Sequence, residues 1–530
     1  MIPIHASQLV GQFLLGRNGT HVPDGWSSER IGDWVLGRHP SLPGIRLFGD
    51  DDRIVGWFLG YPIDGKGKLW NGQEIMRVPG VAAFTATRME EFVYSFGGRF
   101  LAALIDVPEP RLYLDPCGSL GIVYCAHREV VASTPNLIPY DGQTRDRVDL
   151  AREIGIPNTN AMYPLTLTPR HNVERLIPNH YLDLSNWWSV RHWPSRPLRC
   201  DGSVEEAVTA VAEIVKRHIA AITSHIPTYL RLTSGGDSRM LLACSRNVAD
   251  RLELFTVPIP DDGGYIDVAI ARKIAKRFRL PHFVPKYQRS KPEDLERFMY
   301  RIGYSTGELR GWQSTTMFQE ADPGYAQLDG AIGALERGIW YRIGETESTR
   351  ITPERLLECC WGVPQSELTL APMRQWLETI PATDALQVLD LFYLEQRLGC
   401  WAGVLPYAEG CDPGFVIYPM CHREIITRML SLPTQYRLLG FHEYEVHHSR
   451  GTPPFMKAIV EREWPELLAW PFNEPVGFMR LPLAARHARR RLSFLADRAR
   501  RGFAHQAGRA SKGLRNPGWA AERIWDRLTR

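Results

Sequence analysis

The sequence feature that most constrains the fold is a strand, a glycine-rich turn and a helix in direct succession. An apolar strand is predicted at residues 228–232, the turn spans 233–238, and a helix is expected to begin near Ser238. A second strand at 252–257 and a second helix at 267–278 follow. Strands that alternate with helices in this way predict a parallel sheet with crossover helices.

The glycine-rich turn also has the chemistry of an anion site. Glycines let successive backbone N–H groups converge on one anion, and a helix N-terminus adds partial positive charge. Hydroxyl groups donate further hydrogen bonds, whereas Asp237 would act through a magnesium ion that bridges its carboxylate to phosphate. The alternative is an ordinary turn in which Ser or Asp caps the helix. The candidate phosphate-binding residues are Thr233, Ser234, Gly235, Gly236, Asp237 and Ser238.

The rest of the chain divides by pattern around this region. A length of 530 residues predicts two folded domains and a tail. Residues 1–195 hold short apolar runs between Gly, Pro and Asp turns, which indicate a layered, β-rich domain of the α+β class. The polar segment 191–202 is the candidate linker, and 203–479 is the predicted parallel-sheet α/β domain, with extra helices from about residue 350.

Charge is concentrated at the C-terminal end. Residues 480–530 carry a net charge of +11, from 14 basic and 3 acidic residues, although the whole chain carries only +4. We expect a basic helical tail that could bind nucleic acid, anionic lipid or an acidic protein partner. The alternative is a solvated helical extension that packs on the main body.

Cysteine usage and hydropathy suggest a cytoplasmic protein. The nine cysteines are odd in number, scattered and without a CxxC pair, which is typical of reduced thiols and predicts no zinc site. No apolar run reaches the roughly 18 residues that indicate a membrane span. The N-terminus lacks the basic leader and cleavage site of a signal peptide.

The glycine-rich turn resembles the pyrophosphate-binding loop of asparagine synthetases and related ATP pyrophosphatase-type ligases, whose pattern is Ser-Gly-Gly-x-Asp-Ser. At that spacing the family serine falls on Thr233 and its first glycine on Ser234; alternatively the loop starts at Ser234 and is one residue shorter. The segment 267–275, led by Asp267, resembles the helix after the family's second strand. The resemblance implies binding of ATP and Mg²⁺.

Two further segments resemble the active site of this family. Residues 330–341 resemble its second glycine loop, which implies Glu336 as a metal ligand, although the usual Asp-Glu pair is missing. The alternative is a turn followed by a solvent-exposed glutamate. Residues 453–460 offer Lys457, which the resemblance implies as a contact to the phosphates. A cation is needed there because charge builds on the leaving oxygens, whereas the alternative is an ordinary surface lysine.

A helical segment at 390–401 contains two candidate substrate-binding residues. Glu395 could act as general base for an incoming amine, and Arg397 could hold a carboxylate. Equally, both could form structural ion pairs of one helix.

The N-terminal half resembles the glutaminase domain of the same family in the segments 97–106, 115–121, 131–134 and 175–183. That glutaminase works through an N-terminal cysteine whose own α-amino group is the base. Position 2 is Ile2 and the first cysteine is the internal Cys117, so we expect no glutamine hydrolysis. Relatives without this cysteine include β-lactam synthetases and lasso-peptide cyclases.

Together, these features predict an AMP-forming amide ligase. It would adenylate a carboxylate and join it to an amine. The carboxylate and the amine could belong to one substrate, possibly a peptide, or to two separate substrates. One alternative is a catalytically degenerate binding or scaffold protein. Another is sulfur transfer to nucleic acid, with the basic tail as the RNA anchor.

Overall fold

The computed structural model describes twelve stretches of the chain, which are residues 9–72, 75–78, 80, 85–157, 159–260, 262–288, 290–307, 324–342, 344–381, 384–409, 414–433 and 454–473. The chain divides into two units, Met1–Glu474 and Pro475–Arg530. Every described residue belongs to the first unit, so the predicted basic tail lies outside the described residues. The predicted boundary near residues 195–203 falls within the first unit and stays a prediction.

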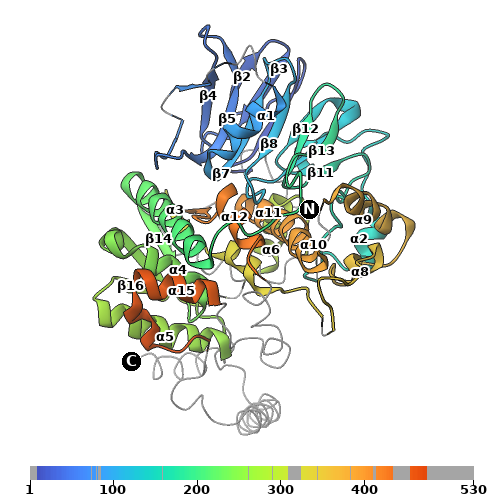
Figure 1. Ribbon diagram of the computed structural model, residues 1–530. Helices are drawn as coiled ribbons and strands as arrows, with labels where there is room; N and C mark the ends of the chain where they lie inside the picture. The colour runs from blue at the N-terminus through green and yellow to red at the C-terminus, as the bar shows by residue number, and fades with distance from the viewer. Residues whose placement is uncertain are drawn as a thin grey trace, which may run out of the picture. The chain divides into compact units, whose positions relative to one another are not determined.

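Two sheets occupy the N-terminal half (Figure 1). Six strands form one sheet in the order β11-β9-β10-β1-β3-β2, and seven form the other in the order β13-β12-β8-β7-β5-β4-β6. Neighbouring strands are antiparallel except for the pair β4 and β6. The strands are β1 (Phe13–Arg17), β2 (Ser27–Ile31), β3 (Trp34–Arg38), β4 (Gly44–Phe48), β5 (Ile54–Ile63), β6 (Met76–Arg77), β7 (Gly97–Leu104), β8 (Arg111–Leu114), β9 (Ile122–Cys125), β10 (Val130–Ala132), β11 (Glu174–Leu176), β12 (His180–Asp183) and β13 (Trp188–Arg191).

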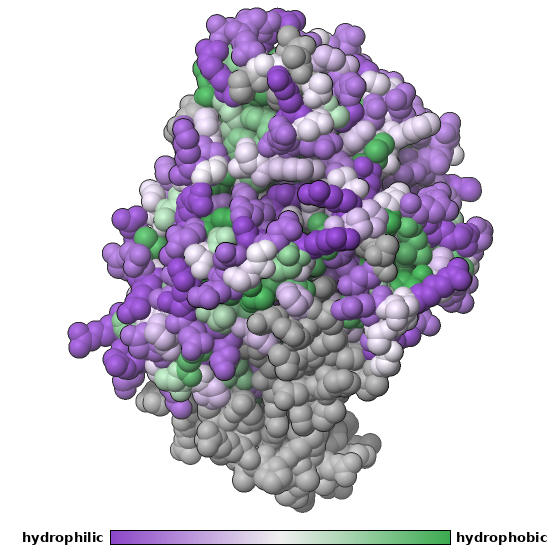
Figure 2. Space-filling model, viewed as in Figure 1, coloured by the Kyte–Doolittle hydropathy of each residue, from purple (hydrophilic) through white to green (hydrophobic). Residues whose placement is uncertain are grey.

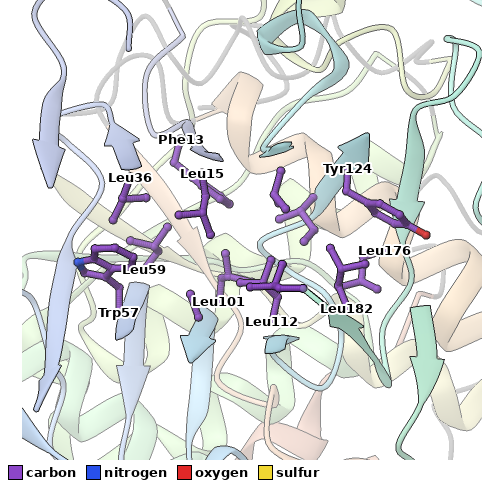
Figure 3. Close-up of a cluster of buried hydrophobic side chains, with 14 of the residues drawn as sticks. Phe13, Leu15, Leu36, Trp57, Leu59, Leu101, Leu112, Tyr124, Leu176 and Leu182 are labelled. Atoms are coloured by element: carbon purple, nitrogen blue, oxygen red, sulfur yellow. The ribbon is translucent and has the colours of Figure 1, made fainter. Parts of the chain in front are cut away.

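The two sheets share one apolar core (Figure 3). Side chains alternate between the faces of a strand, so Trp57 and Leu59 of β5 join this core while Phe58 points to the opposite face. There Phe58 packs in a second cluster with Met89 and Val93 of α1 (Ala86–Tyr94). The predicted layered, β-rich N-terminal fold is confirmed. The residues that Figure 3 labels in the shared core are Phe13, Leu15, Leu36, Trp57, Leu59, Leu101, Leu112, Tyr124, Leu176 and Leu182.

The predicted parallel α/β region is also confirmed. Five strands pair in parallel in the order β16-β15-β14-β17-β18. The helix α4 (Gly236–Cys244) connects β14 to β15, and α5 (Asp262–Phe278) connects β15 to β16. The sequence predicted that α4 begins near Ser238 and α5 at residue 267. Both helices begin earlier, at Gly236 and Asp262. The five strands are β14 (Thr228–Arg231), β15 (Leu252–Phe255), β16 (His282–Phe283), β17 (Tyr325–Leu328) and β18 (Gly414–Ile417).

Residues 192–203 form no helix or strand between β13 and α3 (Val204–His225), which fits the expected linker. A capping box between Ser203 and Glu206 fixes the start of α3. The stretch beyond residue 350 is mainly helical as predicted, except that β18 interrupts it and adds an edge strand to the parallel sheet. The remaining helices are α2 (Val148–Ile154), α6 (Pro292–Arg301), α8 (Pro353–Leu357), α9 (Glu367–Thr379), α10 (Ala385–Phe392), α11 (Gly399–Glu409), α12 (Arg423–Leu430) and α15 (Pro454–Glu463).

The face of the molecule in Figure 2 is mostly hydrophilic, and the described cysteines are free. On the face shown in Figure 2, hydrophilic residues predominate and hydrophobic ones form separate small areas. Among the described residues, no helix is both long and apolar enough to cross a bilayer. The described cysteines are free thiols, and all of them except Cys200 are buried.

The shared core of the two sheets should dominate the stability of the N-terminal half. Leu101 lies in that core with 0% exposure, so Leu101→Ala should lower the free energy of unfolding by about 3 kcal/mol through lost burial and a residual cavity. Leu368, which is 43% exposed on α9, is the matched control, and Leu368→Ala should change it by less than about 0.5 kcal/mol. Urea unfolding followed by circular dichroism measures both values. Equal losses in the two variants would contradict the assignment of the core.

Candidate active site at the glycine-rich turn

The turn leaves the N-terminus of α4 open to a ligand. The cap residue of α4 is Gly235, and no side chain caps the helix. The first N–H groups of a helix have no partner within it, so they remain available to an anion. The alternative in which Ser or Asp caps the helix is therefore wrong. The sequence left this alternative open, because only the structure shows that a glycine ends the strand and starts the helix without any capping side chain.

Two of the three hydroxyls in the turn brace its own backbone. The Oγ of Ser238 accepts a hydrogen bond from the N–H of Thr233 at 3.0 Å and lies 2.8 Å from Thr233 Oγ1. Thr233 Oγ1 in turn accepts from the N–H of Gly235 at 3.1 Å. These contacts hold the strand end against the first turn of α4, so the two hydroxyls shape the site as it stands.

The third hydroxyl connects the turn to two distant segments. The backbone N–H of Ser234 donates to Asp267 Oδ1 at 2.8 Å, and its Oγ lies 2.6 Å from the same oxygen. Ser234 Oγ also lies 3.1 Å from Oδ1 of Asn473, whose N–H donates to the carbonyl of Ser234. The structure thus brings Asp267 to the turn. Asn473 has no local sequence signal, because it reaches the turn only through the tertiary fold.

Arg239 is a site residue that sequence reasoning missed. Its side chain is fully buried, and its guanidinium donates to the carbonyls of Ser234, Trp470 and Pro471 at 2.7 to 2.9 Å. It also lies over the ring of Phe472, 3.9 Å from the centroid. Burial lowers the pKa of Arg239 to about 10, yet the group stays charged at neutral pH. An arginine inside an otherwise apolar helix run is the signal that could have found it.

Two glycines let a second loop approach Asp237 closely. A 3-10 turn, Ala331–Arg337, follows β17 and is preceded by Gly330. A Cβ placed on Gly330 would lie 2.9 Å from Cβ of Asp237, and one on Gly333 would lie 2.9 Å from its Oδ1. Only residues without a side chain allow this approach. Glu336, three residues further on, is brought to the same place.

The two predicted magnesium ligands lie close together as an acidic pair, in which Glu336 is buried and Asp237 is half-buried. Glu336 is 1% exposed, so the alternative of a solvent-exposed glutamate is wrong. Burial, followed by the nearby Asp237, raises the pKa of Glu336 well above its ordinary value. Glu336 Oε2 accepts the backbone N–H of Met456 at 3.3 Å. Among the described residues, no group hydrogen-bonds Asp237 Oδ1 or Glu336 Oε1.

One cation contacts the acidic pair, and a second lies on the helix that borders it. Arg337 forms an ion pair with Asp237 Oδ2. Lys457 lies exposed in the first turns of α15, directly after Met456, whose N–H reaches Glu336. Lys457 therefore belongs to the helix that borders the site, and its contact with phosphate stays a prediction. Arg337 was not predicted, because its partner Asp237 lies 100 positions away and becomes a neighbour only in the fold.

Glu395 lies in a separate buried network. Its two carboxylate oxygens accept from the guanidinium of Arg191, each at 2.7 Å. They also accept from Asn179 at 2.9 Å and from the indole of Trp376 at 2.6 Å. Burial opposes the charge of Glu395, but Arg191, His180 and the hydrogen bond from Asn179 together outweigh burial and lower its pKa. These contacts fit the structural ion pair rather than a base for an incoming amine, and none of them involves the glycine-rich turn.

The internal Cys117 does not have the surroundings of a nucleophile. It is fully buried, and its N–H donates to Asp115 Oδ1 at 3.0 Å. Cys421 Sγ lies 3.0 Å from the same oxygen, so Asp115, Cys117 and Cys421 place potential ligand atoms within 4.8 Å of one another. Asp115 also accepts from Ser119 and from further backbone N–H groups, so its oxygens already serve the turn that they hold together.

Comparisons with known proteins leave the family open. Neither a protein-family model nor a curated protein matches the chain. One solved structure that matches is a glutamine-dependent NAD+ synthetase from Acinetobacter baumannii in complex with adenosine diphosphate, at 14% sequence identity and a TM-score of 0.17. The match covers 42% of this chain and 41% of that chain, which is less than half of either. At this TM-score it carries no argument about fold or function.

The Arg191–Glu395 ion pair predicts a pH-dependent loss of stability. Glu395→Gln should lower the free energy of unfolding at pH 7 by about 3 kcal/mol, because it leaves the buried Arg191 without its counter-charge. Because the pKa of Glu395 is lower in the folded state, its charged form stabilises the fold at pH values above the unfolded pKa of about 4.3. This stabilisation is lost as the pH falls through the folded pKa. The difference between wild type and Glu395→Gln should therefore shrink below about pH 4. Denaturant unfolding from pH 3 to 8 measures it, and a constant difference would contradict the ion-pair assignment.

Proposed function

We propose that this chain is an ATP-dependent, AMP-forming amide ligase of the asparagine-synthetase-like kind, which adenylates a carboxylate and condenses it with an amine without using glutamine. The observation that supports it most is the uncapped N-terminus of α4 beside two carboxylates, Asp237 and Glu336, each of which has one buried oxygen without a hydrogen-bond partner among the described residues. The first feature suits phosphate and the second suits a divalent cation. In this proposal residues 1–195 form an inactive glutaminase-like domain and 203–479 form the synthetase domain.

The donor set fits magnesium. Mg²⁺ prefers carboxylate oxygens and substrate phosphates, and it is usually held by only one or two protein carboxylates. Asp237 Oδ1 and Glu336 Oε1 are two such oxygens without a hydrogen-bond partner among the described residues. When bound, the ion would neutralise the negative charge that develops on the phosphates. The residues assigned to the metal are therefore Asp237 and Glu336.

The chain's own groups would perform the remaining work at the triphosphate. The first N–H groups of α4, at Gly236, Asp237 and Ser238, would bind the departing phosphates, while Thr233, Ser234 and Gly235 hold the turn in shape. Arg337 and Lys457 would add positive charge on that side.

The reaction then has two balanced steps. A carboxylate oxygen of the substrate attacks the α-phosphorus of ATP, and the bond to pyrophosphate breaks. The amine attacks the resulting acyl-adenylate, AMP leaves, and the amine proton passes to solvent or to a base. The contacts of Glu395 do not support it as that base, so the proposal assigns none. Carboxylate and amine could belong to one molecule, as in macrolactam or β-lactam formation.

One observation favours a second candidate, a catalytically degenerate ATP-binding or scaffold protein. Asp237 already has a protein partner in Arg337, and the Asp-Glu pair that is usual in the resembled family is missing from the second glycine loop. Such a protein would bind nucleotide but release no pyrophosphate. Measurement of AMP and pyrophosphate formation with Mg²⁺ and a panel of carboxylates and peptides separates the two. Turnover in the wild type that Asp237→Asn abolishes supports the ligase, whereas ATP binding with no pyrophosphate from any substrate supports the degenerate protein.

The acidic pair should be required for metal-dependent binding of ATP but not for folding. Glu336→Gln should weaken binding of ATP in the presence of Mg²⁺ at least ten-fold, since it removes one ligand. It should leave the metal-free protein at least as stable, because it removes a buried acid close to Asp237. Calorimetry with MgATP and thermal unfolding without metal give the two values. Unchanged binding of MgATP would overturn Glu336 as a ligand.

The close approach of the second loop to Asp237 supplies an independent prediction. Gly330→Ala should weaken binding of MgATP, because its Cβ would lie 2.9 Å from Cβ of Asp237 and 3.1 Å from its backbone carbonyl, so that the two loops must separate. Gly142→Ala is the matched control, since a Cβ there meets nothing within 4 Å. Calorimetry on both variants is the measurement. Equal affinity in Gly330→Ala and Gly142→Ala would show that this approach does not matter to the nucleotide.

A further inference from the structure

A cavity of about 720 Å³ lies in the N-terminal half at the edge of the seven-stranded sheet. Its walls come from β13, from the ends of β9 and β11, and from α9. Figure 1 labels β11, β13 and α9 in the same region of the molecule. The volume falls within the roughly 300 to 1,000 Å³ of small-ligand pockets. Neither the glycine-rich turn nor the acidic pair contributes to it, so the cavity is separate from the candidate active site.

The strand β13 presents free main-chain groups at this cavity. Among the described strands it is the last of its sheet and pairs on the side of β12 alone. The N–H of His192 donates to the carbonyl of Asn179, which fixes the register in which residues 188 and 190 bond to β12. By the alternation of an antiparallel ladder, the N–H and C=O of Ser189 and Arg191 face the open edge. Ser189 is itself part of the cavity wall.

The strand β13 is short, with four residues, but the side chains that it exposes are apolar rather than charged. Natural edge strands are short, or carry lysine, proline or other charges. The edge strand β6 has two residues, and β2 carries Glu29 and Arg30. In contrast, β13 exposes Trp188 at 71% and Val190 at 36%. Its single charge, Arg191, is held by the buried ion pair with Glu395.

The cavity wall also offers a buried, unpaired acceptor. His180 is 5% exposed, and its Nδ1 lies 3.1 Å from the carbonyl of Pro178, so Nδ1 carries the hydrogen and Nε2 is the acceptor. Among the described residues, no group hydrogen-bonds this Nε2. Burial, and then Arg191, lower the pKa of His180 to about 4, which keeps the ring neutral at neutral pH.

The remaining wall indicates the chemistry of the occupant. Trp187, Trp188 and Trp376 supply aromatic surface, which suits an apolar side chain. Glu174 is the one acidic or basic side chain of the Asp, Glu, Lys and Arg types that lines the cavity, so its charge favours a cationic ligand. Free main-chain groups, aromatic surface and one carboxylate match an extended peptide with apolar and basic residues.

We propose that this cavity binds a short extended peptide, which pairs with the free edge of β13 and carries an apolar residue toward the indoles and a basic residue toward Glu174. Thr379 Oγ1 of α9 accepts from Nε of Arg191 at 2.9 Å, so α9 closes the cavity at the end of β13. The edge of a second folded copy would have to displace that wall. This inference does not depend on ATP chemistry.

The test uses the full-length protein and a library of blocked hexapeptides with lysine at alternating positions. The best sequence selected is remade with N-methyl groups on each alternating set of amides, and with glutamate in place of lysine. Binding is measured by fluorescence anisotropy. We expect one of the two N-methylated forms, and the glutamate form, to bind at least ten-fold more weakly than the parent peptide.

Two matched variants locate the site. Trp188→Lys places a cation on the exposed edge and should weaken binding at least ten-fold, whereas Trp361→Lys changes a tryptophan that is 59% exposed and does not line the cavity, and should leave it unchanged. Circular dichroism confirms that both variants are folded. The proposal is overturned if the library yields no binder, if both N-methylated forms bind as well as the parent, or if the two variants bind alike. Dimerisation that Trp188→Lys alone abolishes would also overturn it, in favour of a second copy.

Discussion

The described part of the molecule depends on one buried ion pair between its two halves. The guanidinium of Arg191 is 6% exposed and the carboxylate of Glu395 is 0% exposed, so each charge is stable only with its partner present. Arg191 ends β13, whereas Glu395 lies in a π-helical turn, Tyr393–Leu398, between α10 and α11. Asn179 donates to Glu395 and accepts from Arg423 of α12, which extends the network to a third segment. Breaking any one contact would leave a buried charge or donor without a partner.

The same ion pair gives the cavity and the candidate active site a common support. Trp376 and Thr379 of α9 bond to Glu395 and Arg191, so two walls of the cavity are fixed by the one network. Asp390 lies in the last turn of α10, directly before the π-helical turn that carries Glu395, and accepts a hydrogen bond from Tyr341 at 2.6 Å. Tyr341 lies four residues beyond Arg337, and so the segment that carries Glu336 is attached to the same helix. Both sites therefore rest on one packed framework.

The sequence was sufficient for elements with a clear period and for contacts close in the chain. The alternation around the glycine-rich turn predicted β14, α4, β15 and α5, and the position after a second glycine loop identified Glu336. Sequence alone left two roles open for Glu395, because its partner Arg191 is 204 positions away. Arg239 and Asn473 were missed for the same reason, since their partners become neighbours only in the fold. The strand β18 was missed because four residues between helices carry too little pattern to separate a strand from a loop.

The charge balance around Asp237 gives the proposed function its particular form. Glu336 and Asp237 repel each other when both are charged, and the structure relieves this in two ways: burial, followed by Asp237, raises the pKa of Glu336, and Arg337 forms an ion pair with Asp237. Arg337 holds Oδ2 of Asp237, and among the described residues no group hydrogen-bonds Oδ1, so the proposed Mg²⁺ would bind at Oδ1 without breaking this ion pair. The guanidinium would then remain close to the ion and repel it. We therefore expect this site to bind Mg²⁺ less tightly than the same carboxylates would without Arg337.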